Sequence, residues 1–217
     1  MENRKRCVII GGAPIGRYGR IRKHLRAEDY LVFCDSGLKH AQPLQAKPDL
    51  IVGDFDSTEN PHLDVETIVL PREKDDTDTV YAVKEAVKRG FNEFLLVGVV
   101  GKRLDHTLGN VSILLYLDAL EMKGCILDDY SEMEVISSHP ATVGGEAAFF
   151  SLLNISGCAK EITITGAKYP LEHAEISCEY QYGISNEVLP GQTARIEVGQ
   201  GRLLLIKILK EEQEACV

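Results

Sequence analysis

The sequence predicts an α/β protein, in which a mainly parallel sheet domain is followed by a small antiparallel β-sandwich domain. Over residues 6–127, short apolar runs alternate with segments of helical spacing, which is typical of a parallel sheet with helices on both faces. Several of these runs stop abruptly in glycine or aspartate. From residue 131 onward, short β-type runs are separated by turn residues and no helical spacing is evident. We therefore expect domains at residues 1–130 and 131–217.

Composition restricts the class of protein. The chain has 217 residues, 44% of them hydrophobic and 26% charged, as in ordinary globular proteins. A formal net charge of -9 argues against nucleic acid or an anionic membrane as the main partner. Six cysteines without a CxxC pair disfavour a zinc site or a disulfide framework. No segment approaches the ~20 apolar residues that span a bilayer, and a cytoplasmic protein is expected.

The first domain is expected to be Rossmann-like. Its expected strands are 6–10, 30–34, 49–52, 65–70, 94–99 and 125–127. Helices are expected at 77–89 and 105–122, with a short helix before the third strand. Five basic residues on a helix after the first strand predict a solvated basic face: Arg17, Arg20, Arg22, Lys23 and Arg26. The β-type runs of the second domain are 134–137, 147–153, 161–165, 174–177, 194–198 and 202–209.

A glycine-containing turn at 11–16 follows the first strand. Glycines at such a place let the backbone approach a ligand closely. The turn lacks both the G-x-G-x-x-G spacing and the GK[ST] ending of a P-loop. A plain tight turn and a turn that contacts a nucleotide at Gly12 are equally compatible with it.

Asp54 and Asp56 follow a buried strand that ends in Gly53. If the strand geometry continues, side chains alternate and both carboxylates project to one side, where they repel each other unless a cation or a shared proton intervenes. Mg²⁺ fits best, because one or two carboxylates together with substrate phosphates are its usual ligands. The structural alternative is a polar loop in which Asp56 and Ser57 cap the next segment.

A second acidic group, Asp75, Asp76 and Asp78, precedes the expected helix 77–89. Acids in a first helical turn are favourable by ~0.3–1 kcal/mol each, and Asp76 or Thr77 alone would explain an N-cap. Three acids in four residues exceed what a cap requires. Lys74 beside them either offsets this charge or reaches a phosphate.

The segment 98–106 combines glycines, basic residues and a helix start, which suits an anion. Arg103 offers planar, bidentate donors to a phosphate. Asp105 is a candidate N-cap, a metal ligand or both, and His106 is a structural hydrogen-bonder or a catalytic group. Gly109 costs ~1 kcal/mol inside a helix, so we expect a close approach to the backbone there.

These groups together predict a site for an ATP-like polyphosphate. Several carboxylates repel such an anion unless Mg²⁺ and nearby basic side chains offset the charge, and the same cations stabilise phosphoryl-type transfer. No Ser–His–Asp or Cys–His arrangement with recognisable spacing occurs in the sequence. Covalent catalysis is therefore disfavoured.

The motifs, in their order and spacing, resemble the thiamine pyrophosphokinase (thiamine diphosphokinase) family over nearly the full length. The matching segments are Gly11–Pro14, Asp35–Gly37, Gly53–Ser57, Lys74–Asp78, Gly101–Asn110, Gly166–Leu171 and Gly183–Glu187. The resemblance implies that MgATP donates its terminal diphosphate to the thiamine hydroxyl and releases AMP. It also implies a homodimer with thiamine bound between subunits.

Residue roles follow from the resemblance. The metal and phosphate-site acids would be Asp54, Asp56, Asp75 and Asp78, completed by Asp35 and Asp105. Asp78 is our choice for the acid that orients or deprotonates the thiamine hydroxyl. Nucleotide contacts are expected from Gly12, Asp35, Lys74, Arg103, His106 and Asn110. Thiamine contacts are expected from Asp78, Tyr169, Ser185 and Asn186.

The sequence departs from the family pattern at three positions. Tyr169 stands where Trp is common, Ser36 replaces a commoner Gly, and Lys102 replaces a frequent second Gly. Tyr can still stack on thiamine rings. Two other functions stay open: a related pyrophosphokinase or metal-dependent nucleotide hydrolase, and a non-catalytic nucleotide sensor. The retained acids argue against the sensor.

Overall fold

A computed structural model describes residues 6–55, 63–73 and 75–211 of the chain. It divides into two compact units, Met1–Asp129 and Tyr130–Val217, called here the N-terminal and C-terminal units. No described helix is both long and apolar enough to cross a membrane. Each unit is described by itself below.

The N-terminal unit is built on a parallel sheet. Its strands are β1 (Cys7–Ile10), β2 (Tyr30–Cys34), β3 (Leu50–Gly53), β4 (Glu66–Val69), β5 (Glu93–Val97) and β6 (Lys123–Leu127). Their order in the sheet is β4-β3-β2-β1-β5-β6, and every neighbouring pair is parallel. All residues of β1 and β3 are buried, which explains why these strands are continuous apolar runs.

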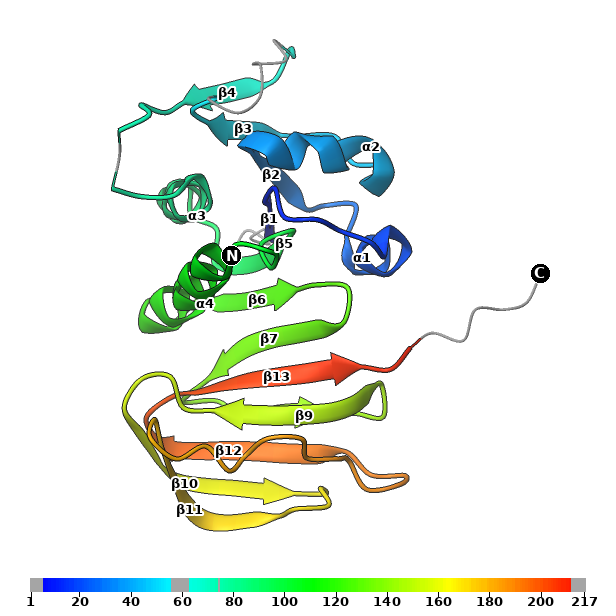
Figure 1. Cartoon of the computed structure of the whole chain (residues 1–217), viewed down its shortest axis with the longest axis vertical. Coiled ribbons are helices and arrows are strands. Elements are labelled where there is room, and N and C mark those ends of the chain that lie inside the picture. Colours follow the sequence, from blue (N-terminus) through cyan, green and yellow to red (C-terminus); the bar gives the residue numbers. More distant parts are fainter. Residues whose placement is uncertain (1–5, 56–62, 74, 212–217) are drawn as a thin grey trace, which may run out of the picture. The chain divides into compact units, whose positions relative to one another are not determined.

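The helices of this unit pack in pairs (Figure 1). They are α1 (Tyr18–His24), the 3₁₀ helix η1 (Asp35–His40), α2 (Ala41–Leu44), α3 (Asp78–Lys88) and α4 (Leu104–Ala119). α3 contacts α4 and three strands, and α1 contacts α2. The solvated basic face predicted for α1 is wrong at Arg20, whose side chain is buried.

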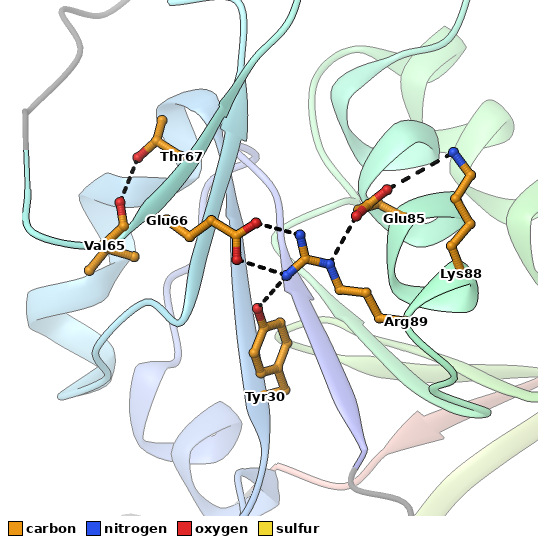
Figure 2. A network of polar contacts seen from close by, with 7 residues as sticks. All are labelled: Tyr30, Val65, Glu66, Thr67, Glu85, Lys88 and Arg89. Atoms are coloured by element: carbon orange, nitrogen blue, oxygen red, sulfur yellow. Dashed lines mark hydrogen bonds and ion pairs between the residues drawn. The ribbon is translucent and has the colours of Figure 1, made fainter.

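A charged network joins the amino ends of the strands (Figure 2). The Arg89 guanidinium, just after α3, donates to both Glu66 carboxylate oxygens at 2.9 and 2.6 Å and to Glu85 Oε1 at 2.9 Å. It also donates to Tyr30 Oη at 3.0 Å. Tyr30 begins β2 and Glu66 begins β4, so this network joins the amino ends of these strands. The predicted acids that follow β2 and β3 lie at the opposite, carboxyl ends of the strands.

The C-terminal unit is an antiparallel β-sandwich. One sheet contains β7 (Ser131–Ile136), β13 (Leu203–Leu209) and β9 (Ala147–Leu153) in that order. The other has the order β11 (Leu171–Ser177), β10 (Cys158–Thr165), β12 (Ala194–Gln200) and β8 (Ala141–Val143). Side chains from both sheets, including Phe150, Leu205, Ile162 and Ile196, form one core. The α/β fold followed by a sandwich is as predicted.

Candidate active site

The strand order reverses between β1 and β5. From β1 the chain proceeds outward through β2, β3 and β4, and then returns to the other side of β1 with β5. In open parallel sheets, ligands bind at the carboxyl ends of the strands where the order reverses in this way. The turns after β1 and β5 therefore border the expected ligand site.

These two turns are bonded to each other. The Gly11 N–H donates to the Val97 carbonyl and the Ala13 N–H to the Gly98 carbonyl, both at 2.8 Å. A Cβ on Gly11 would lie 2.6 Å from the Gly98 oxygen, and Gly98 itself has a φ of +63°. A side chain at Gly11 would force these turns apart, so its absence is required by the fold itself.

The neighbouring strands end in acids. Asp35 follows β2 and Asp54 follows β3, and both are half-buried. A Cβ on Gly53 would lie 3.1 Å from the Cα of Asp35, so the two strand ends approach each other closely. The structure thus brings Asp35 and Asp54 to adjacent strand ends, while Asp56 lies outside the described residues.

The start of α3 is bonded to the carboxyl end of β2. The Thr77 hydroxyl caps the helix by accepting the Val80 N–H at 3.3 Å. The Cys34 thiol donates to the Asp78 carbonyl at 3.8 Å, which ties the first helical residue to the end of β2 beside Asp35. The Asp78 Oδ1 atom is buried.

The other residues of this acidic segment have different surroundings. Asp76 accepts two hydrogen bonds from Lys84 Nζ, at 2.9 and 2.7 Å, so its negative charge is paired with a lysine of α3. Asp75 is exposed. Lys74 lies outside the described residues. Of the acids in this segment, Asp78 is therefore the one built into the strand edge.

Arg103 and Asp105 form a bidentate ion pair at the start of α4. The guanidinium donates to the two carboxylate oxygens at 2.9 and 2.6 Å, although both side chains are largely exposed. The hydrogen bond from Arg103 holds the pKa of Asp105 well below its ordinary value. Arg103, rather than Asp105, occupies the N-cap position, so the N-cap alternative for Asp105 is wrong.

Asn110 was expected to contact the nucleotide and Gly109 to have a group close to its backbone, and the structure shows different surroundings for both. Asn110 is buried, and its amide donates to the Val99 carbonyl at 2.8 Å, which secures the turn between β5 and α4. Gly109 is exposed, and no described atom lies within 4 Å of a Cβ built on it. A close approach to its backbone is therefore wrong for the described part of the chain. His106 is exposed as well.

Lys39 and His40, at the end of η1, contact the glycine turn, which was not predicted from the sequence. The Lys39 ammonium donates to the Gly12 carbonyl. The buried His40 ring lies between Tyr18 Oη, 2.8 Å from Nδ1, and the Ala13 carbonyl, 2.9 Å from Nε2. η1 also crowds the turn, because a Cβ on Gly12 would be 2.0 Å from Ser36 Oγ. These contacts join residues that are far apart in the sequence, so no local sequence pattern predicts them.

Asp129 was also missed, and here a signal existed. Its carboxylate accepts the Gly16 N–H at 2.7 Å and the Arg17 N–H at 2.8 Å, and its carbonyl accepts Arg20 Nη1 at 3.2 Å. It therefore holds the two residues that lead into α1. Asp128 and Asp129 follow β6, so the pattern of an acid after a strand, as with Asp35 after β2, would have found it.

The described residues do not present a complete metal site by themselves. Within residues 6–55, 63–73 and 75–211, no group of three or more His, Cys, Asp and Glu side chains is placed to hold an ion. This arrangement fits a cation held by one or two carboxylates and completed by substrate phosphates, as is usual for Mg²⁺. Of the predicted ligands, Asp54, Asp75 and Asp78 lie within the described residues, and Asp54 and Asp78 are the half-buried ones.

A second constellation lies in the C-terminal unit. The Asn186 side chain, which is 5% exposed, accepts the Tyr169 N–H at 3.0 Å and donates to the Tyr169 carbonyl at 2.8 Å. Ser185 has a φ of +59°, and its N–H donates to Ser151 Oγ at 3.1 Å. The structure thus brings Tyr169, Ser185 and Asn186 together, as two loops fixed by the Asn186 amide.

The Tyr169 ring is available to a ligand. Its side chain is 57% exposed, and Lys168 Nζ lies 5.6 Å from the ring centroid. Lys168 also pairs with Glu187 at 2.7 Å. An exposed aromatic face on a rigid backbone can stack on a planar cationic ring.

Two family models match this sequence. The model described as "Thiamin pyrophosphokinase, catalytic domain" matches residues 21–126, and "Thiamin pyrophosphokinase, vitamin B1 binding domain" matches residues 139–203. A protein of Bacillus subtilis named thiamine pyrophosphokinase is 28% identical over 163 residues, which is 71% of this chain and 76% of that protein.

Solved structures with these names share the fold. Thiamin pyrophosphokinase from Geobacillus thermodenitrificans is 27% identical, with a TM-score of 0.81 over 98% of this chain and 100% of that chain. The Bacillus subtilis structure is 23% identical and has a TM-score of 0.83 over 95% and 100%. The two matched segments of the family models fall on the two units described above.

Proposed function

Because the chain belongs to the thiamin pyrophosphokinase family and is an enzyme of that type, making thiamine diphosphate by pyrophosphoryl transfer, we propose that MgATP is its donor. The terminal diphosphate passes to the thiamine hydroxyl, and AMP leaves. The observation that carries the proposal is that two bonded glycine turns, after β1 and β5, and the acids Asp35 and Asp54, after β2 and β3, all lie at the carboxyl ends of neighbouring parallel strands.

The proposed reaction is a displacement at the β-phosphorus of ATP. The thiamine oxygen forms a bond to this phosphorus, and the bond between the β-phosphorus and the oxygen bridging to the α-phosphorus breaks. That oxygen and its electron pair leave with AMP. Asp78 is proposed to orient the hydroxyl and take its proton, because it is the helical acid that is fastened to the strand edge.

Positive charge offsets the phosphates. Mg²⁺, held by Asp54 and Asp78 with Asp56 and Asp75 as further proposed ligands, neutralises charge on the transferred group when bound. Arg103 is placed on the turn after β5 and is proposed to exchange its contact with Asp105 for a phosphate. Asp35 and Asp105 are proposed to complete the acidic site, which is part of the catalytic domain of residues 1–130.

The glycine turn is proposed to hold the nucleotide. The backbone at Gly12 is proposed to lie against the nucleotide, in a turn where a side chain at this position would collide with Ser36. Lys74 and His106 are proposed as further phosphate contacts. The buried Asn110 is proposed to act through the turn that it secures, since its amide already bonds to Val99.

The second domain, residues 131–217, is proposed to bind thiamine and to dimerise. Tyr169 supplies an exposed ring for the cationic heterocycle, and Ser185 and Asn186 shape the adjacent loops. We propose a homodimer with thiamine between the subunits, where water that competes with the hydroxyl is excluded. A cytoplasmic location is part of this proposal.

The deciding experiment measures AMP release from MgATP with and without thiamine, with mass analysis of the product. Thiamine-dependent AMP and a product heavier by a diphosphate are expected. AMP or ADP release regardless of thiamine would indicate a nucleotide hydrolase. Turnover with a hydroxymethyl pterin but not with thiamine would assign a related pyrophosphokinase.

A further inference from the structure

A buried histidine bridges the glycine turn and the start of α1. His40 is 2% exposed and is the last residue of η1. Its Nε2 lies 2.9 Å from the Ala13 carbonyl oxygen and its Nδ1 lies 2.8 Å from Tyr18 Oη. Ala13 lies within the turn after β1, and Tyr18 is the first residue of α1. One side chain is thereby bonded both to the turn and to the first residue of α1.

The direction of these hydrogen bonds is fixed by chemistry. A backbone carbonyl only accepts, so Nε2 must carry the proton. Nδ1 of the neutral ring then has only a lone pair, and the Tyr18 hydroxyl donates to it. Burial lowers the pKa of His40, and the positive charge of Lys39 acts in the same direction, so the neutral ring is the form present at pH 7.

Other hydrogen bonds tie the turn to β5, to Asp129 and to Lys39. The Ala13 N–H bonds to the Gly98 carbonyl and the Gly16 N–H bonds to Asp129, while the Gly12 carbonyl accepts Lys39. His40 is the contact that spans from the turn to the first residue of α1. Without the His40 ring, the Ala13 carbonyl lacks this hydrogen bond inside a half-buried turn. The turn is then no longer connected to Tyr18 through His40.

We infer that His40 and Tyr18 are positioning residues, which hold the turn of residues 11–17 in the conformation that binds the nucleotide. This inference rests on the proposed function in one respect: MgATP is taken to bind at this turn. A turn that is held in place in advance binds its ligand without an ordering penalty, and a displacement of about 1 Å has large effects on transfer. Neither residue touches substrate in this account.

Tyr18→Phe and Tyr30→Phe form a matched pair for the test. Each substitution removes one phenolic hydroxyl and one hydrogen bond. Tyr18 bonds to His40 beside the turn, and Tyr30 bonds to Arg89 at the opposite edge of the sheet. Tyr18→Phe is expected to raise KM for MgATP about fivefold, the equivalent of one hydrogen bond, without raising KM for thiamine. Tyr30→Phe is expected to leave both KM values unchanged.

His40→Leu and His40→Gln extend the test. His40→Leu is expected to raise KM for MgATP more than Tyr18→Phe does, with a smaller change in kcat. His40→Gln keeps an amide donor within reach of the Ala13 carbonyl and is expected to restore most of the loss. Equal KM values for MgATP in Tyr18→Phe, Tyr30→Phe and the active wild type would overturn the inference. So would a His40→Gln variant as impaired as His40→Leu.

A measurement without substrate separates this inference from the proposed function. Hydrogen exchange of the Ala13 and Gly16 amides is expected to be faster in Tyr18→Phe than in Tyr30→Phe or the wild type. Unchanged exchange in Tyr18→Phe overturns the inference even if the enzyme is active. A wild type that binds MgATP but releases no AMP with thiamine overturns the proposed function, and the two tyrosine variants are then compared by calorimetric MgATP affinity.

Discussion

Asn186 exchanges two hydrogen bonds with the backbone of Tyr169, accepting its N–H at 3.0 Å and donating to its carbonyl at 2.8 Å. A buried amide thus holds in place a residue whose ring is exposed. The ring and the amide should therefore respond differently to substitution.

We expect Tyr169→Ala to raise KM for thiamine while leaving KM for MgATP and the thermal midpoint unchanged, because the ring is exposed and proposed to stack on thiamine. Tyr180→Ala, which removes another exposed tyrosine of the same unit, is the control and should be neutral for both KM values. Equal increases in both KM values for Tyr169→Ala would mean that the ring supports the fold instead.

We expect Asn186→Ala to destabilise the protein by about 1–3 kcal/mol, because it leaves the Tyr169 and Glu187 N–H groups without their buried acceptor. Chemical denaturation monitored by circular dichroism measures this change. KM for thiamine should also rise, since the loop that carries Tyr169 loses its support. A variant as stable as the wild type would contradict the role given to Asn186.

Asp56→Asn and Asp78→Asn are both expected to abolish turnover, the first as loss of a metal ligand and the second as loss of the group that takes the proton. Steady-state AMP release with varied Mg²⁺ measures both. Excess Mg²⁺ should not restore Asp78→Asn. Thr77→Ala is the control, because it removes only the cap of α3 and should cost about 1 kcal/mol of stability with kcat retained. Near-normal activity of Asp56→Asn would exclude a metal role.

The ion pair between Arg103 and Asp105 allows a test of both partners. Arg103→Gln should lower kcat/KM for MgATP about tenfold or more, the size expected for a charged hydrogen bond to phosphate. Asp105→Asn releases Arg103, so a lower KM for MgATP is expected if pairing with Arg103 is its main effect. A large fall in kcat for Asp105→Asn would support its proposed place in the acidic site.

Burial of His40 predicts a pH dependence of stability. Its pKa is lowered in the folded state, so the unfolded chain binds more protons at acidic pH. The contribution of His40 is therefore fully present above its ordinary pKa of about 6.5 and is lost as the pH falls below it, by at most about 1.4 kcal/mol per pH unit. His40→Gln should make the free energy of unfolding less steep between pH 7 and pH 5. An unchanged slope would contradict this.

The sheet of the N-terminal unit could be predicted well from the sequence. Its strands are short apolar runs with abrupt polar ends, and β2 occupies residues 30–34 as expected. β8 was missed, because three residues in a turn-rich stretch give no usable period. β10 was predicted too short: it begins at Cys158, and left-handed backbone at Glu161 breaks the alternation within it.

The candidate site could be predicted where polar residues end a strand. Asp35 and Asp54 were found in this way, and Asp129 could have been. His40 could not, because its role arises from a tertiary contact between η1 and the turn after β1. Asn110 was noticed as a polar residue in an apolar helix, but its partner Val99 becomes evident only when α4 folds back on β5.

The hydrogen bonds from Gly16 and Arg17 to Asp129 have a consequence for dividing the protein into fragments. Asp129 is the last residue of the N-terminal unit, yet it satisfies two backbone N–H groups beside the glycine turn. A fragment that ends at Leu127 would therefore contain every strand of the parallel sheet and still lack a contact that the turn needs. Fragments or fusions of this protein should be joined after residue 129, and a hinge engineered before it would loosen the start of α1.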